Sequence, residues 1–427
     1  MRSDKLALFG GPKTINKKFK RYNTIGIEEQ NAVKSVLENG ILSKYLAKWG
    51  EDFFGGPMVK KFEEDWKNKF EVKHAITVNS WTSGLICAVG AIGIEPGDEI
   101  IVPPWTMSAS AMAILHWNAI PVFADIDPIT FCIDPISIEK NISPYTKAIM
   151  AVDIGGQSAD MDAIVKIANK NNLKIISDTA QSPGAKYNGK FAGTIADIGG
   201  YSLNCHKHIH TGEGGVLVTN DDVLAKKMRL IRNHAEAVVG DIKFDDLTNM
   251  IGHNFRLGEI ESAIGIEQLE KLDNLIISRQ LIAKKLYEGL RNLDGLVLPE
   301  IRKNCTHVYY MFFMKLDLNL LKRAKRENIF NALKAEGVEG LSLKYLNIHL
   351  LPIFQRKQAY GTKGFPWNSE FTKRDINYNK GICPVSESLE DKNYLGFQMC
   401  LFEMDKIEVD LMISSFQKVW KNLEHLN

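Results

Sequence analysis

Residues 147–177 read KAIMAVDIGGQSADMDAIVKIANKNNLKIIS. Two short apolar runs, at 147–152 and 173–177, enclose a segment from Met161 to Lys170 whose apolar residues have helical spacing. Because each run is apolar along most of its length, we expect strands that are covered on both faces. A strand, a crossover helix and a second strand of this kind predict a parallel sheet.

The same alternation extends outward, from about residue 55 to residue 220. It predicts an α/β fold with a mostly parallel sheet flanked by helices. Ligands of such sheets bind beyond the carboxyl ends of the strands, so residues that follow strands are the candidates for function. The further expected helices are 59–70, 85–93 and 109–117, and the further expected strands are 75–78, 99–102 and 120–124.

The C-terminal part has a different pattern, which predicts a smaller α+β domain. The pattern is helical and charged from Glu259 to Leu290, with one long helix expected over 269–286. Gly289 and Gly295 suggest a boundary near 285–295. We therefore divide the chain into a large domain with an N-terminal arm, residues 1–285, and a small domain, residues 286–427. Within the small domain we expect a strand at 307–313 and helices at 320–336 and 407–423.

Composition excludes several classes of protein. The chain has 427 residues and a net charge of +2, which gives no electrostatic case for binding nucleic acid or an acidic membrane. Met1 to Leu6 lacks the apolar stretch of a signal peptide, and no run is long enough to span a membrane. The six cysteines are scattered without a CxxC pair, as in reduced thiols. We expect a cytoplasmic protein.

Lys207 stands in an unusual segment, GYSLNCHKHIHTGEGG over 200–215. A β-prone run precedes it, and a glycine-rich turn and a second apolar run at 216–218 follow. Glycines let the backbone come close to a ligand, and a desolvated lysine loses its proton more easily and attacks carbonyls. The alternative is an ordinary surface lysine in a hairpin, and this segment alone does not separate the two.

Asp178 follows the expected strand 173–177 and offers a partner for such a lysine. Pyridoxal 5′-phosphate (PLP) needs a lysine for its Schiff base and a carboxylate that faces its pyridine nitrogen, so that the protonated ring can take up electrons. The alternative for Asp178 is a helix N-cap, a position that aspartate favours.

A phosphate group would need hydroxyls and backbone N–H groups. The segment from Asn79 to Gly84 lies between an expected strand and an expected helix, where both are available, although serine and threonine there are often simple caps. Ser202 lies close to Lys207 in sequence and could reach the same phosphate.

Taken together, these motifs resemble the DegT/DnrJ/EryC1/StrS family of PLP-dependent sugar aminotransferases. The likeness is strong over about residues 5–285 and weak beyond. It rests on six motifs in the same order and spacing: Gly97–Pro103, Gly156–Asp162, Asp178–Gln181, Ser202–Lys207, Gly212–Gly215 and His253–Leu257.

The resemblance implies a fold-type I transferase that works as a homodimer with a shared active site. Lys207 would be the Schiff-base lysine and proton shuttle, Asp178 the partner of the pyridine nitrogen, and Gln181 the neighbour of the phenolic oxygen. The phosphate would be held by Thr82, Ser83 and Ser202, and by Asn254 of the neighbouring subunit. Arg256 would either contact substrate or form a structural ion pair.

Three departures from the family pattern concern the pocket. Met107 stands where an aromatic residue usually stacks on the cofactor ring; a methionine can pack on a ring face, or Trp105 could help. Trp81 replaces the usual glycine before the phosphate threonine, and Leu203-Asn204 replaces the usual Phe-His. These changes leave the cofactor assignment in place and make the substrate pocket uncertain.

His206, His208 and His210 alternate around the lysine. In an extended segment they would share one face and could bind zinc. We favour instead one histidine in the substrate pocket and the others in solvent, and we expect no metal site.

The expected activity is transfer of an amino group from glutamate, or glutamine, to a keto-sugar in the biosynthesis of cell-surface polysaccharide or amino sugars. Alternatives are the same chemistry on a non-nucleotide acceptor (a keto-octulosonate or cyclitol), sugar dehydration, or a PLP-binding regulator without turnover. The family's dehydratases replace the lysine with histidine, so Lys207 argues against dehydration. We expect the loop 351–367, with Phe354, Arg356, Lys357 and Trp367, to shape the acceptor pocket.

Overall fold

The computed structural model describes residues 4–427, so residues 1–3 of the N-terminal stretch considered above lie outside it. Its centre is a seven-stranded sheet in the order β2-β10-β9-β6-β5-β3-β4, in which β10 alone runs opposite to the other six strands. The expected mostly parallel α/β sheet is therefore confirmed. The strands are β2 (His74–Val78), β3 (Glu99–Val102), β4 (Ile120–Phe123), β5 (Thr146–Val152), β6 (Lys174–Asp178), β9 (Ile198–Ser202) and β10 (Gly215–Thr219).

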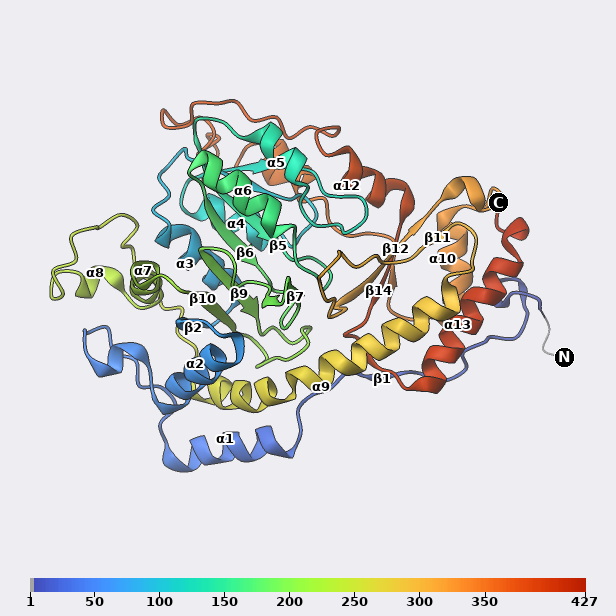
Figure 1. Ribbon diagram of the computed structural model, residues 1–427, viewed down its shortest axis with the longest axis horizontal. Helices are drawn as coiled ribbons and strands as arrows, with labels where there is room; N and C mark the ends of the chain where they lie inside the picture. Colours follow the sequence, from blue (N-terminus) through green and yellow to red (C-terminus); the bar gives the residue numbers. More distant parts are fainter. Residues whose placement is uncertain (1–3) are drawn as a thin grey trace.

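Helices cover both faces of this sheet (Figure 1). On β9 the backbone of Gly200 faces Trp81 of α3, whereas the next side chain, Tyr201, contacts Trp66 of α2. Successive residues of a strand point to opposite faces, so α2 and α3 lie on opposite sides. The helices of this part are α1 (Ile27–Asn39), α2 (Pro57–Phe70), α3 (Trp81–Ala91), α4 (Ala109–His116), α5 (Pro135–Asn141), α6 (Met161–Asn171), α7 (Asp222–Arg232) and α8 (Ala235–Val238).

A second, four-stranded antiparallel sheet lies at the other end of the molecule, joined to the first by the long helix α9 (Figure 1). Helix α9 covers the whole expected helical stretch from Glu259 to Leu290 as one helix, longer than the single helix expected over 269–286, and Gly289 lies inside it. The elements of this part are α9 (Glu259–Leu290), β11 (Leu296–Val297), β12 (Met311–Leu316), α10 (Arg326–Ala335), β13 (Leu341–Ser342), α11 (Pro352–Gln355), α12 (Pro384–Ser388), β14 (Tyr394–Gln398) and α13 (Lys406–Lys421).

Two expected elements of this part have different bounds. The strand expected at 307–313 begins only at Met311, because Tyr309 has a left-handed backbone (φ 54°) that no strand accommodates. The helix expected at 320–336 shortens to α10, because Lys322 and Arg323 also have positive φ.

The division into 1–285 and 286–427 stays a prediction, and side-chain packing crosses it in both directions. Leu6, Ile15 and Phe19 of the N-terminal arm pack in the core formed by α10, α13 and the second sheet. In the opposite direction, Phe354 and Tyr378 pack in the core of the large sheet. Two short strand pairs complete the topology: β1 (Lys20–Arg21) with β15 (Phe402–Glu403), and β7 (Lys186–Tyr187) with β8 (Lys190–Phe191).

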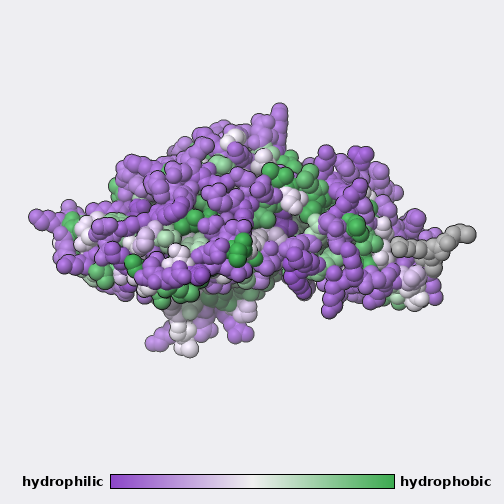
Figure 2. Space-filling view, turned by 90° about the horizontal axis from the view of Figure 1, so that it is seen from below, coloured by the Kyte–Doolittle hydropathy of each residue, from purple (hydrophilic) through white to green (hydrophobic). Residues whose placement is uncertain are grey.

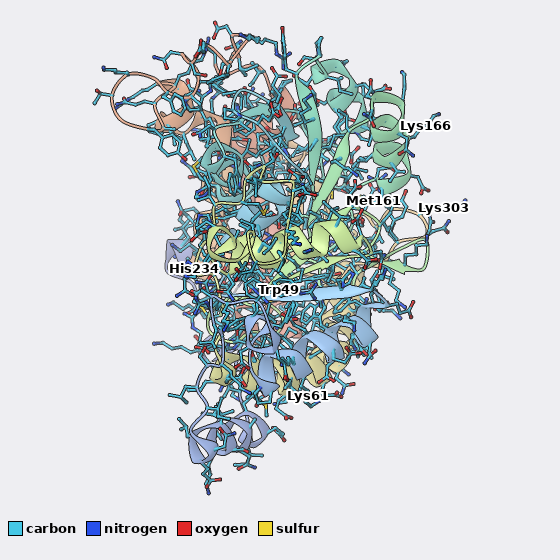
Figure 3. The ribbon with its side chains drawn as sticks, turned by 90° about the vertical axis from the view of Figure 1, so that its left-hand side faces the viewer. Trp49, Lys61, Met161, Lys166, His234 and Lys303 are labelled. Atoms are coloured by element: carbon cyan, nitrogen blue, oxygen red, sulfur yellow. The ribbon has the colours of Figure 1, made fainter. Side chains whose placement is uncertain are left out.

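The face of the molecule shown in Figure 2 is mostly hydrophilic. Seen from below, the molecule shows small separate groups of hydrophobic side chains among polar ones (Figure 2). Lys166 of α6 and Lys303 project outward at one margin (Figure 3). Within residues 4–427, no helix is both long and apolar enough to cross a membrane.

Candidate active site

A cavity of ≈ 360 Å³ lies where β6 and β9 end. This is the edge at which α/β sheets bind ligands. Much of its lining comes from residues that end strands, closely follow them or begin helices. The lining residues are Ser80, Trp81, Thr82, Thr106, Met107, Ala109, Val152, Asp178, Ala180, Gln181, Ser202, Asn204, His206, Lys207, Glu213, Tyr310 and Tyr345.

Lys207 lies in the loop between the antiparallel strands β9 and β10, and its side chain reaches the cavity. Its Nζ lies 4.5 Å from the centre of the Tyr310 ring. Burial lowers the pKa of Lys207 below its ordinary value, and the negative charge of Asp178 partly opposes this. A lysine with a lowered pKa is more often in the neutral form that attacks a carbonyl.

Asp178 is the last residue of β6, and its carboxylate faces the same cavity. It begins no helix; instead each carboxylate oxygen accepts a buried side-chain hydrogen bond. Trp81 Nε1 donates to Oδ1 at 2.7 Å, and Ser110 Oγ donates to Oδ2 at 2.8 Å. The carboxylate is therefore fixed in one orientation.

The N-terminus of α3 contributes hydroxyls and backbone N–H groups. Ser80 is the N-cap and accepts from the Ser83 N–H at 3.1 Å, while the exposed Thr82 lines the cavity. The Ser83 hydroxyl donates to Asn79 Oδ1 at 2.7 Å and is not part of the lining, so Ser80 stands nearer the cavity than Ser83. The first N–H groups of a helix lack partners within the helix and favour an anion.

Gln181 lies in the cavity wall, held by two hydrogen bonds. Its Oε1 accepts from the Gly155 N–H at 2.8 Å, and its Nε2 donates to the Tyr345 hydroxyl at 2.7 Å. One Nε2 proton remains to face a ligand. Burial raises the pKa of Tyr345 to about 12, so its hydroxyl keeps its proton at neutral pH.

The other expected site residues have different positions. Ser202, the last residue of β9, lines the cavity, as does Met107, whose side chain is 63% exposed. Trp105 does not replace Met107, because it is buried behind Tyr345 with ring centres 5.4 Å apart. Asn254 is exposed and lies outside the lining of this chain's own cavity.

The three histidines do not share one face, because the segment from Asn204 to Ile209 is a series of turns. His206 lines the cavity, as expected for one histidine. The expectation that the others lie in solvent is wrong for His208, which is fully buried because its Nε2 donates to the Val308 carbonyl at 2.8 Å. His210 is partly buried. Among residues 4–427 there is no group of three or more histidine, cysteine or acidic side chains placed to hold a metal ion.

Sequence reasoning missed Tyr310, Tyr345 and Ser110. Tyr310 and Tyr345 come from the C-terminal part, where no motif marks them, and they also line an adjoining cavity of ≈ 260 Å³ together with His206 and Lys344. The loop 351–367 was expected to shape the acceptor pocket, and within this chain it lines neither cavity. Phe354 is buried against Phe123 at the sheet edge, away from the site.

The residues of the cavity fit PLP. Its volume suits a small cofactor, and a lysine of lowered pKa, a fixed carboxylate and a helix N-terminus with hydroxyls all face it. These are the three groups that a pyridoxal ring and its phosphate require, and they come from three separate elements of the fold.

Known proteins are similar to this chain in sequence over most of its length. The spore coat polysaccharide biosynthesis protein SpsC of Bacillus subtilis is 34% identical over 86% of this chain and 92% of its own length. A putative L-glutamine:3-amino-2,3-dideoxy-scyllo-inosose aminotransferase of Streptomyces kanamyceticus is 34% identical over 100% of this chain and 99% of its own length.

Structural similarity agrees with sequence similarity. The X-ray structure of an aminotransferase from Psychrobacter cryohalolentis matches with a TM-score of 0.80 and 26% identity, covering 95% of this chain and all of the other. This places the fold among the fold-type I aminotransferases, as expected. The family model matches residues 24–384, and the chain belongs to the DegT/DnrJ/EryC1/StrS aminotransferase family.

Proposed function

We propose that the protein binds PLP in the cavity around Lys207 and uses it to move an amino group from glutamate or glutamine to a keto-sugar. The observation that carries this proposal is that Lys207 and Asp178 face one cavity, with Asp178 held by hydrogen bonds to both of its carboxylate oxygens. Lys207 holds the cofactor and moves the proton, and Asp178 faces the ring nitrogen. Gln181 faces the phenolic oxygen, and Met107 packs on the ring.

The phosphate lies at the N-terminus of α3 in this proposal. Thr82 and Ser202 present hydroxyls to it, and Ser83 supports the turn that carries Thr82, because its N–H donates to Ser80 Oγ and its hydroxyl donates to Asn79 Oδ1. PLP, when bound, supplies a protonated ring that takes up the electrons released at the amino acid's α-carbon. The chain supplies the base, since the neutral amine of Lys207 can accept that proton.

The relatives support a class of acceptor. The polysaccharide role named for SpsC supports a keto-sugar acceptor and a place in the biosynthesis of cell-surface polysaccharide or amino sugars. The absence of a membrane-spanning helix in residues 4–427 is compatible with a cytoplasmic location acting on small molecules.

A second acceptor class, a cyclitol or another ketone without a nucleotide, has its own support. The scyllo-inosose relative aligns over the whole chain, including the C-terminal part that lines the adjoining cavity, whereas SpsC aligns over 86%. The printed donor of that relative, glutamine, makes glutamine the second donor to test.

We further propose a homodimer in which Asn254 of one subunit reaches the cofactor phosphate of the other. Asn254 is exposed and outside its own cavity, as a residue that serves a neighbouring subunit would be. Arg256 has no ion pair among the contacts of the described residues and lies over the Tyr45 ring, so it is available to the same interface.

The test is addition of glutamate, and separately glutamine, to the purified protein loaded with PLP. We expect the visible absorbance of bound PLP to convert to that of pyridoxamine phosphate, with release of the keto acid. No change with either amino acid would reject the aminotransferase reading and favour a binding protein without turnover.

Product analysis separates the remaining alternative. Mass spectrometry of the acceptor should show a gain of nitrogen with the original hydroxyls otherwise retained. Loss of a hydroxyl without gain of nitrogen would indicate dehydration.

A further inference from the structure

Trp81 is the first residue of α3, and its indole packs against Gly200 of β9 and reaches Asp178. The Nε1 donates to Asp178 Oδ1 at 2.7 Å, and both side chains are 5% exposed. An indole has one donor and no acceptor, so this hydrogen bond uses its whole polar capacity. Because the acceptor is a carboxylate, the bond is charge-assisted and stronger than a neutral one.

Two glycines leave the space that the Trp81 indole occupies. Gly200 of β9 pairs in register with Asp178 of β6, and a Cβ built on Gly200 would lie 2.1 Å from two indole carbons of Trp81. Gly84 of α3 is similarly close, with a Cβ 2.6 Å from the ring. A side chain at either glycine would displace the indole, so the two glycines make its position possible.

The second carboxylate oxygen has a donor of its own. Ser110 Oγ donates to Asp178 Oδ2 at 2.8 Å and also lies 3.1 Å from the Thr106 hydroxyl. Oδ1 also accepts from the Ala180 N–H at 3.3 Å, so donors on both oxygens fix the plane of the carboxylate. Asp178 held in this way lines the cavity.

We propose that Trp81 is a positioning residue, which together with Ser110 fixes the Asp178 carboxylate for the ring nitrogen of the cofactor. The proposal rests on the assignment of the cavity to PLP. Trp81 touches the acid and acts on the cofactor through it. In this chain Trp81 stands where the family usually has a glycine, directly before Thr82. It therefore adds a hydrogen bond to Asp178 that a glycine could not make.

The test compares two single substitutions that each remove one buried indole N–H. Trp81→Phe keeps an aromatic ring against Gly200 and removes the donor to Asp178. Trp117→Phe is the matched control: Trp117 is also 5% exposed, packs against a glycine of α3, Gly90, and donates to a backbone carbonyl, that of Ile86, at 2.8 Å.

The readout is the dissociation constant of each protein for PLP and for 1-deaza-PLP, in which carbon replaces the ring nitrogen. We expect Trp81→Phe to weaken PLP binding about tenfold, the size of one hydrogen bond to a charged group. Binding of the deaza analogue should change less than about twofold, since it has no ring nitrogen for Asp178 to face. Trp117→Phe should leave both constants at their wild-type values.

Several outcomes would overturn the proposal. Equal PLP affinity in Trp81→Phe and wild type would do so, as would an equal loss for PLP and its deaza analogue, which indicates a packing effect. A loss of PLP affinity in Trp117→Phe equal to that in Trp81→Phe would also indicate a packing effect.

Ser110→Ala gives a second, smaller perturbation of the same carboxylate and should show the same selectivity for PLP over the analogue. Failure of the wild-type protein to bind PLP would reject the proposed function itself, an outcome distinct from all of these.

Discussion

His307 and His208 are neutral imidazoles in the interior, where the C-terminal segment meets the Lys207 loop. Burial lowers the pKa of each to about 3. His307 Nδ1 accepts from the Tyr309 N–H at 2.9 Å, which requires an unprotonated nitrogen. The turn at Tyr309 therefore needs a neutral His307, whereas His208 joins the lysine loop to the C-terminal segment through its Nε2–H donated to the Val308 carbonyl.

Stability should fall as the pH falls, and His307 should carry part of the loss. The unfolded histidine takes up a proton near pH 6.5, whereas the folded one does so only near pH 3, so its contribution is complete above pH 6.5 and is lost below it. Between pH 7.5 and pH 5 the loss from this group should reach about 2 kcal/mol of unfolding free energy.

His307→Asn keeps an acceptor for Tyr309 and removes the titrating ring. Urea unfolding at the two pH values should show a smaller pH effect in the variant than in the wild type. If the unfolding free energy of the variant changed between the two pH values as much as that of the wild type, His307 would not be a source of the pH dependence.

At the level of single residues, sequence reasoning worked where a side chain ends a strand. Lys207 and Asp178 follow or end apolar runs, and such positions converge at one edge of a parallel sheet. It failed for Trp81, whose role depends on the space left by Gly200 on a strand far along the chain. No local pattern records such a pair.

The N-terminus of helix α2 is capped by a side chain from helix α9. Its N-cap is Gly56, which has no side chain to accept from the first N–H groups. The carboxylate of Glu259, at the start of α9, accepts from the Met58 N–H at 2.8 Å and the Val59 N–H at 3.3 Å instead. A Cβ on Gly56 would lie 2.6 Å from that carboxyl carbon, so the glycine gives it room.

Glu259→Ala should therefore destabilise the protein by about 1–2 kcal/mol, the usual cost of losing an N-cap or a charged hydrogen bond. Chemical denaturation would measure it. Glu270→Ala, at an exposed position of the same helix, is the control and should change the unfolding free energy by less than about 0.5 kcal/mol. Equal effects of the two substitutions would contradict the capping role.

Elements with strong periodicity could be predicted from sequence, and those with non-local constraints could not. The strands of the large sheet lie within one or two residues of expectation, because their apolar runs are bounded by turns. The run from His307 to Tyr310 looks like a strand, but its backbone turns at Tyr309, where it meets Gly156 of the large part. That contact joins residues about 150 positions apart and leaves no local signal.

On the scale of the whole molecule, the N-terminal arm binds both parts together. Tyr22 donates to the His208 carbonyl at 2.6 Å, and its ring lies 4.2 Å from the Arg279 guanidinium. The arm thus supports the loop that carries Lys207 while its first residues pack in the C-terminal core. The expected boundary near residue 285 assigns the arm to the large domain alone. The sequence pattern could not predict its contacts with the C-terminal core, because it does not show which distant segments touch.

The proposed shared site predicts complementation between inactive subunits. Lys207→Ala lacks the lysine, and Asn254→Ala lacks the residue proposed to reach the partner's phosphate. A mixed dimer restores one complete site, built from Lys207 of one subunit and Asn254 of the other.

Random mixing of equal amounts should give about a quarter of the wild-type activity, since half the dimers are mixed and each has one complete site. Each variant assayed alone at low PLP sets the baseline. Activity of the mixture no higher than the mean of the two variants would contradict a site shared in this way.

The central claim is that Lys207 holds the cofactor. Borohydride reduction of the protein loaded with PLP, followed by protease digestion and mass spectrometry, locates the lysine covalently bound to it. We predict the pyridoxyl group on the peptide containing Lys207, and its loss in Lys207→Ala. A label on another lysine, or a specific label that persists in Lys207→Ala, would contradict the account.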